Sequence, residues 1–296
     1  PQMRVGEGLA GNVIARQSTM HVIDLQNAPE AKNEMLVRRE GFVTYIGIPL
    51  IVKGQIKGVF EVYHRTTLSP TPDWMDFLHT LAGQAAIAID SSQLFESMQR
   101  SNRELMQAYD TTLEGWARAL EIRDRETEGH SRRVTELTIR LARYMGLSES
   151  ELVHLHRGVL LHDIGKMGVP DHILKKTGKL DDEEWVEMRK HPVYAYNLLA
   201  PISYLRGALD IPYCHHEHWD GSGYPRGLKG EQIPLSARIF SVIDIWDALL
   251  SDRPYRKAWS REKVIDYLHE VAGTILDPTI VPVFFQMIEN ETKEMG

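Results

Sequence analysis

The sequence predicts a multi-domain protein in three parts: an α+β segment, a long coiled-coil helix and an all-α helical bundle. Three observations predict it. β-branched and aromatic runs lie in the first part, a proline-free apolar repeat occupies residues 74–123, and helical periodicity dominates the remainder. We expect the parts to span 1–72, with a closing helix to about 92, then 73–115, then 116–296.

The N-terminal part contains a predicted β-hairpin. The runs "VTYIGIPLIV" and "GVFEVYH" are joined by "KGQIKG", a turn that contains glycine, and "HVIDL" reads as a further short strand. Pro70 and Pro72 interrupt the chain, and Asp73 is placed to cap the helix that follows.

The middle part predicts one long helix with a coiled-coil seam. Its seam positions are alternately four and three residues apart: Leu81, Ala85, Ala88, Ser92, Phe95, Gln99, Asn102, Met106, Tyr109, Leu113, Trp116 and Leu120. At 1.5 Å per residue the helix would be roughly 75 Å long, too long for one small domain. We therefore expect a homodimer through this linker. The alternative is two ordinary amphipathic helices with a bend near Ser91-Ser92.

The last part is predicted to be helical. The segments expected to form helices are "SRRVTELTIRLARYMG", "ESELVHLHRGVLLHDIGK", "LDDEEWVEMRKH" and "SARIFSVIDIWDALLS". Acidic residues suit the start of the third segment. The fourth is strongly apolar, so we expect a central buried helix.

Composition limits the classes of function. A net charge of −7 gives no basic footprint for DNA or an anionic membrane. The single cysteine, Cys214, excludes an internal disulfide framework and fits a reducing, cytoplasmic compartment. No apolar run approaches the roughly 20 residues of a membrane span. Because the chain starts at Pro1 rather than Met, we expect it to be a piece of a longer protein.

Histidines and carboxylates set against apolar helix faces predict a metal site. Each of these residues, taken alone, is more simply explained as a helix cap, a member of a surface pair or a core residue. The set is different, because buried charges require partners or metal ions. It comprises five histidines and three carboxylates: Glu126, His130, His162, Asp163, His191, His215, His216 and Asp244.

The donor types narrow the choice of metal. Imidazole with carboxylate suits iron, manganese, zinc or nickel, and the absence of cysteine ligands argues against a structural zinc site. Eight donors exceed the needs of one ion and suit two or three, with Asp163 placed to bridge.

Residues from about Leu113 to Met287 resemble an HD-GYP domain, a branch of the HD metal-dependent phosphohydrolases. The matching pieces are "RDRETEGHSRRV", "LLHDIGKMGVPDHIL", "HHEHWDGSGYPRGLKGEQIPLSARI", "VIDIWDAL" and "SDRPYRKAW". The HD pair, the HHE triplet and the Gly-Tyr-Pro motif are intact and in order.

This resemblance implies a cyclic di-GMP phosphodiesterase with metal ligands at His130, His162, Asp163, His191, His215, His216 and Asp244. Glu126 implies three metals rather than two, iron first, with manganese as substitute. Lys166 takes the place of the family's phosphate-binding lysine, and Arg253 and Arg256 that of its basic loop. Tyr224 and Pro225 belong to a loop that recognises substrate or a partner, or else acts as a structural lid.

The implied reaction is attack by a metal-bridging hydroxide on phosphorus, in line with the leaving 3′ oxygen. Lys166 and the two arginines would neutralise accumulating charge, and Asp244 would steer the water. The product would be linear pGpG or GMP.

One rival function is that of a receptor that binds its ligand without turnover, which the complete ligand set disfavours. Another is a general HD nucleotidase, which the "GYP" and "RPYRK" motifs disfavour.

The N-terminal part is similar to the C-terminal half of a GAF domain. The resemblance lies in "GEGLAGNVIARQSTMHVIDL" and "IGIPLIVKGQIKGVFEVYH". It implies a partial GAF domain that either senses a small ligand or protein partner or serves only to dimerise the chain.

Overall fold

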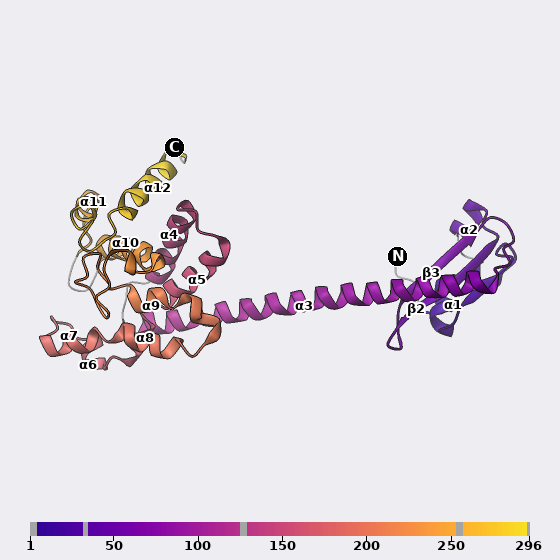
Figure 1. The fold of residues 1–296 in the computed structure, drawn as a ribbon, viewed down its shortest axis with the longest axis horizontal. Coiled ribbons are helices and arrows are strands. Elements are labelled where there is room, and N and C mark those ends of the chain that lie inside the picture. Colours follow the sequence, from indigo (N-terminus) through magenta and orange to yellow (C-terminus); the bar gives the residue numbers. More distant parts are fainter. Residues whose placement is uncertain (1–4, 32–34, 125–128, 253–256, 295–296) are drawn as a thin grey trace. The chain divides into compact units, whose positions relative to one another are not determined.

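The structure, a computed structural model, describes the chain in four stretches: residues 5–31, 35–124, 129–252 and 257–294 (Figure 1). The chain divides into two compact units, Pro1–Leu105 and Met106–Gly296. Helix α3, Pro72–Asp124, contributes residues to both units.

The N-terminal unit is built on a small antiparallel sheet. Its strands, in the order β1-β2-β3, are Met20–Val22, Thr44–Val52 and Gln55–His64. The predicted hairpin is confirmed as β2 and β3, which turn at Lys53 and Gly54. Both of these residues have positive φ, 49° and 77°, as a tight two-residue hairpin turn requires. The strand predicted from "HVIDL" is shorter than expected: β1 ends at Val22.

The two faces of this sheet bury different side chains. On one face Tyr45 packs with Leu9 and Val13 of α1, Gly8–Arg16. On the other face Ile46 and its neighbours on β2 pack against the first turns of α3. The short helices η1, Pro29–Ala31, and α2, Met35–Glu40, complete the unit.

Helix α3 runs without interruption through 53 residues, so the alternative of two helices separated near Ser91-Ser92 is wrong. Leu81, Phe95 and Tyr109 of the predicted seam are 41%, 59% and 44% exposed. Leu113 and Leu120, by contrast, are buried within the C-terminal unit. The coiled-coil pairing itself stays a prediction.

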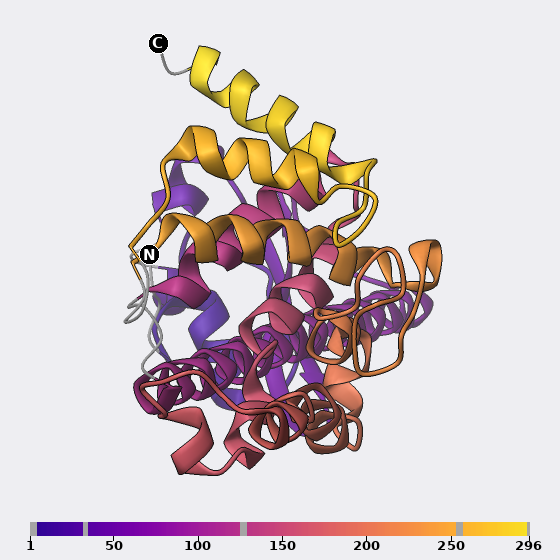
Figure 2. The same ribbon diagram turned by 90° about the vertical axis from the view of Figure 1, so that its left-hand side faces the viewer.

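Most residues of the main core of the C-terminal unit lie on five helices, with Ile211 of a sixth, α9 (Asp210–Cys214), packed among them. Figure 2 shows the ribbon of these helices. The five are α4, His130–Tyr144; α5, Glu149–Leu160; α10, Leu235–Leu250; α11, Arg261–Glu270; and α12, Ile280–Glu294. The expectation of a central buried helix is confirmed, because Ile239, Phe240 and Ile243 of α10 are fully buried.

Shorter elements complete the C-terminal unit. They are η2, Ile164–Gly168; α6, Asp171–Leu174; α7, Asp182–Met188; α8, His191–Leu199; η3, Ser203–Ala208; α9, Asp210–Cys214; and η4, Gly230–Gln232. A second core cluster joins Leu161 and Ile164 to Leu199 of α8 and to Leu113 of α3. None of the helices described is long and apolar enough to cross a membrane.

The predicted helix over 149–166 is wrong at its end, because α5 stops at Leu160 and the HD pair lies in the turn that follows. Gly165, two residues after the HD pair, explains why η2 packs so closely against α8. A Cβ atom on Gly165 would collide with the backbone carbonyl of His191 and lie 2.6 Å from the backbone nitrogen of Ala195. Only glycine lets η2 approach α8 this closely.

We predict that Gly165→Ala lowers the free energy of unfolding by roughly 1–3 kcal/mol, the usual cost of overpacking a core. Gly115→Ala is the matched control, because nothing lies within 4 Å of its added Cβ atom. In a helix interior this control should be neutral or stabilising by up to about 1 kcal/mol. Urea denaturation measures both, and equal stability of the two variants would contradict the steric explanation.

Candidate metal centre

Five separate segments bring the predicted ligands together. His130 and His191 are the first residues of α4 and α8, and Asp244 lies within α10. The described ligands form two sets, and within each set the ligand atoms lie within 4.8 Å of one another. One set is Asp163, His191, His215 and His216; the other is His130, His162 and Asp244.

Three of the imidazoles are oriented by backbone carbonyls. In each, Nδ1 lies at hydrogen-bonding distance from a carbonyl oxygen: His162 to Val159 at 2.8 Å, His191 to Met188 at 2.8 Å, and His215 to Ile211 at 3.0 Å. Because a carbonyl only accepts, Nδ1 carries the hydrogen and donates it. With Nδ1 taken up by the backbone, the other ring nitrogen, Nε2, is the atom that each ring presents to the cluster as a candidate ligand.

These lone pairs face one another and an anion. The Nε2 atoms of His191 and His215 are 3.3 Å apart, and they lie 3.4 and 3.7 Å from Oδ1 of Asp163. Burial lowers the pKa of His191 to about 4, so its ring is neutral near pH 7. Facing lone pairs repel unless a cation lies among them, and the donor types suit a transition metal. The residues therefore fit a metal site.

Asp163 lies between the two ligand sets. Its Oδ1 faces the first set, whereas its Oδ2 lies 3.1 Å from Nε2 of His162 and 2.8 Å from Nζ of Lys166. Burial alone would raise the pKa of Asp163, but the Lys166 ammonium group, the strongest opposing influence, helps to hold that pKa well below its usual value. An ionised carboxylate with one oxygen toward each set has the position expected of a bridging ligand.

His130 is oriented by a carboxylate that sequence analysis missed. Its Nδ1 lies 2.7 Å from Oδ2 of Asp247, and Arg133 donates to both oxygens of Asp247 at 2.7 and 3.0 Å. Burial raises the pKa of Asp247, but hydrogen bonds from His130 and Arg133 outweigh it and lower that pKa to about 2. This is the carboxylate–histidine arrangement that commonly supports metal ligands.

Asp244 is less buried than its apolar surroundings in the sequence indicate. Its side chain is 25% exposed, whereas that of Asp247 is 11% exposed. Asp244 Oδ1 lies 3.7 Å from Nε2 of His130. Both aspartates lie on α10 three residues apart, so one turn of a helix supplies a candidate ligand and the partner of another ligand.

Lys166 lies at the edge of the cluster. Its ammonium group is 2.8 Å from Asp163 and 2.6 Å from Oδ2 of Asp124, near the end of α3. Asp124 was not among the predicted site residues. Asp124 lies in the motif "RDRETEGH", but nothing in the motif indicates that it pairs with Lys166.

The loop containing Gly-Tyr-Pro is fixed by the last residue of the HHE triplet. Glu217 is buried, and its two carboxylate oxygens accept hydrogen bonds from the backbone N–H groups of Arg226 and Leu228 at 2.7 and 2.8 Å. Tyr224 stacks on His216, with ring centroids 4.7 Å apart. Glu217 therefore supports the loop, and the loop places Tyr224 directly beside the cluster.

Three predicted site residues, Glu126, Arg253 and Arg256, lie outside the described residues. Pro225 is described, and it follows Tyr224 through a cis peptide bond. Cys214 is buried beside Ile233, in a small apolar cluster.

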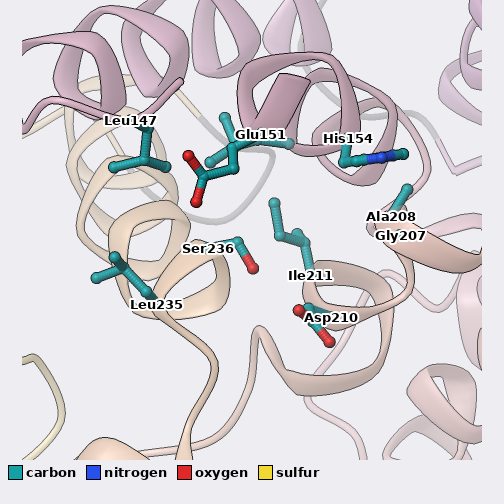
Figure 3. A pocket seen from close by; sticks show the side chains of 10 residues that line it. Leu147, Glu151, His154, Gly207, Ala208, Asp210, Ile211, Leu235 and Ser236 are labelled. Carbon is teal, nitrogen blue, oxygen red and sulfur yellow. The ribbon is translucent and has the colours of Figure 1, made fainter. Parts of the chain in front are cut away.

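A cavity of about 220 Å³ lies elsewhere in the C-terminal unit (Figure 3). It is formed by α5, the η3–α9 segment and the start of α10, and it is lined by Glu151, His154, Asp210 and Ser236 among others. None of the described predicted ligands lines it. The hollow is therefore separate from the metal centre.

Comparison with known proteins identifies the family. Residues 115–280, more than half of the chain, match the HD domain family. The chain belongs to the HD domain family. Residues 1–90 match the GAF domain, so both resemblances predicted from the sequence are confirmed.

Similar proteins include several phosphodiesterases. The chain is 40% identical over 190 residues to the cyclic di-GMP phosphodiesterase response regulator RpfG of Xanthomonas campestris, covering 64% of this chain and 50% of that protein. It is 42% identical over 171 residues to a cyclic di-GMP phosphodiesterase of Thermotoga maritima, covering 56% and 46%. It is 41% identical over 172 residues to 3'3'-cGAMP-specific phosphodiesterase 2 of Vibrio cholerae, covering 57% and 33%. The HD-domain chain thus spans half or less of these relatives.

We predict that Asp247→Asn weakens metal binding by about 10- to 100-fold, because His130 loses the carboxylate that orients its ring. Asp266→Asn is the control, since Asp266 lies exposed on α11 away from the cluster. Calorimetric titration of the metal-free protein with Mn²⁺ measures both. Equal Mn²⁺ affinity in Asp247→Asn and the unsubstituted protein would contradict this assignment.

Proposed function

We propose that this chain is a metal-dependent phosphodiesterase that hydrolyses cyclic di-GMP. The observation that carries the proposal is the convergence of imidazole Nε2 atoms on the ionised, buried Asp163. The names of several relatives supply the substrate class. Two or three divalent transition metals would be held, iron first and manganese as substitute.

The cluster residues would each hold or orient part of the centre. His162, His191 and His215 present lone pairs, Asp163 divides its two oxygens between the ligand sets, and Asp244 completes the set of His130. Metals in such a site lower the pKa of bound water to about 7 and polarise phosphoryl oxygens. These donors suit that chemistry without a nucleophilic side chain.

Lys166 and Asp244 are suited to different parts of the reaction. The ammonium group of Lys166 would attract a phosphoryl oxygen and oppose negative charge that grows in the transition state. Asp244 is more exposed than Asp163, the other described carboxylate of the two ligand sets, so of these two it is the better placed to accept a proton from an attacking water molecule.

Tyr224, Pro225, Arg253 and Arg256 would contact substrate. The ring of Tyr224 lies against His216, and the Arg189 guanidinium lies 5.5 Å from the Tyr224 ring centroid. Burial raises the pKa of Tyr224, so its phenol stays neutral and able to donate a hydrogen bond to a base or phosphate. The product would be linear pGpG, with GMP after a second cleavage.

A second candidate substrate is 3'3'-cGAMP. The Vibrio cholerae relative named as specific for it is as similar in sequence as the cyclic di-GMP enzymes are. Both molecules present the same kind of phosphodiester to the metal centre, so the choice between them would depend on the base contacts.

The N-terminal unit would regulate this activity in a cytoplasmic homodimer. Exposed apolar side chains along α3, including Leu94, Phe95 and Met98, are available to pair with a second copy. The GAF-like sheet would bind a small ligand or protein partner.

The direct test is anaerobic purification, metal analysis and incubation with cyclic di-GMP and 3'3'-cGAMP, with products separated by chromatography. We expect hydrolysis of cyclic di-GMP by iron- or manganese-loaded protein and no turnover after His162→Ala or Asp163→Ala. His154→Ala, in an exposed position of α5, is the control and should retain activity. No hydrolysis of either dinucleotide by fully metal-loaded protein would overturn the proposal.

We also predict that Glu126→Ala lowers the metal content by about one ion per chain, because two other carboxylates and five histidines would still hold the remaining ions. Metal analysis of the purified variant, compared with Glu136→Ala on the outer surface of α4, checks this. An unchanged metal content would contradict a third metal held by Glu126.

A further inference from the structure

The last turn of α3 is fastened to the segment that follows the HD pair. Arg123 uses every N–H group of its guanidinium in this contact. Nη1 donates to the carbonyl of Lys166 at 2.9 Å and approaches Sδ of Met167 at 3.8 Å, and Nη2 donates to the carbonyl of Val169 at 2.9 Å. Nε and Nη2 also donate to Oδ1 of Asp171 at 3.2 and 2.9 Å.

The acceptors of Arg123 explain what it fixes. Two are backbone carbonyls of residues 166 and 169, so the contact depends on the path of the main chain rather than on a flexible side chain. The carbonyl of Lys166 lies within the short helix η2 and that of Val169 directly after it, and η2 begins directly after Asp163. The position of Arg123 therefore bears on both Asp163 and Lys166.

The same turn of α3 also contacts the start of α4, which supplies His130 to the second ligand set. Oε1 of Glu121 accepts a hydrogen bond from the backbone N–H of Ser131 at 3.0 Å, next to His130 in α4. Asp124 pairs with Lys166 at 2.6 Å. One helical turn thus contacts the segments that supply ligands to both sets.

We propose that Arg123 is a positioning residue of the metal centre, which fixes residues 163–171 to the end of α3 and so sets the place of Asp163 and Lys166. The consequence for phosphate binding by Lys166 rests on the proposed function. Because α3 is continuous from Pro72, a displacement of this helix would reach the metal ligands through Arg123.

The chain offers variants that separate positioning from charge. Arg123→Lys keeps the positive charge but loses the planar fork that reaches both carbonyls and the carboxylate. Arg123→Gln loses the charge as well. Asp171→Asn removes the charge of a 59% exposed carboxylate that pairs with Arg123 and with Lys175, and it leaves both carbonyl contacts of Arg123. Arg132→Gln removes an 83% exposed arginine of α4 as a general control.

The measurement is calorimetric titration of the full metal-free chain with Mn²⁺, normalised to the folded fraction from circular dichroism. We expect Arg123→Lys and Arg123→Gln to bind Mn²⁺ about 10-fold more weakly, as for other residues that orient metal ligands. Asp171→Asn and Arg132→Gln should bind as the unsubstituted chain does. Loss of a positive charge alone would strengthen cation binding, so weaker binding in Arg123→Gln reports lost positioning.

Amide hydrogen exchange gives a second readout. Exchange should accelerate over residues 164–171 in Arg123→Lys and stay unchanged in α10. Unchanged Mn²⁺ affinity in both Arg123 variants, or equal weakening in Asp171→Asn, would overturn the proposal. Mn²⁺ binding needs no substrate, so the Mn²⁺ affinities test the role of Arg123 independently of catalysis. Absence of hydrolysis in every variant would count against the proposed function only.

Discussion

The structure depends on one electrostatic constraint: imidazole lone pairs and a buried carboxylate face one another across distances of 3 to 4 Å. Without positive charge among them, this arrangement is repulsive. Carbonyl acceptors at Nδ1 prevent the rings of His162, His191 and His215 from relieving it by turning an N–H inward. The fold therefore places these side chains in an arrangement that suits a bound cation.

The surrounding elements maintain this arrangement through steric fit and hydrogen bonds. Gly165 allows η2 to lie against the start of α8, which brings His191 to Asp163. The ring of Phe240 on α10 lies 4.9 Å from that of His162 and 6.1 Å from that of His215, so a buried apolar surface backs both imidazoles. Glu217 fixes the loop that carries Tyr224. The same packed side chains thus form the core and orient the ligands.

The sequence predicted the elements whose signals are local. The β-hairpin could be recognised because β-branched runs flank a glycine turn, and α10 because its apolar pattern is long. The ligands could be grouped because histidines and carboxylates on apolar faces have few other stable environments. These signals need no knowledge of which segments meet.

The supporting residues could not be predicted in the same way. Asp247 and Asp244 lie three residues apart on one helix, and only the position of His130 on α4 separates their roles. In the sequence, Arg123 and Asp124 resemble ordinary charged residues at the end of a helix. Their roles depend on the contact between the end of α3 and η2, which only the structure shows. The end of α5 was misplaced because the apolar run continues past it, whereas the close approach of α8 favours a turn.

Cations that occupy the space among these facing donors can be seen by anomalous diffraction from crystals of the protein loaded with Mn²⁺. We expect two or three peaks, each roughly 2.0–2.3 Å from ligand atoms of the cluster, with one between Asp163 and the Nε2 atoms of His191 and His215. Fully loaded crystals with peaks only elsewhere, or with no peak among these side chains, would contradict it.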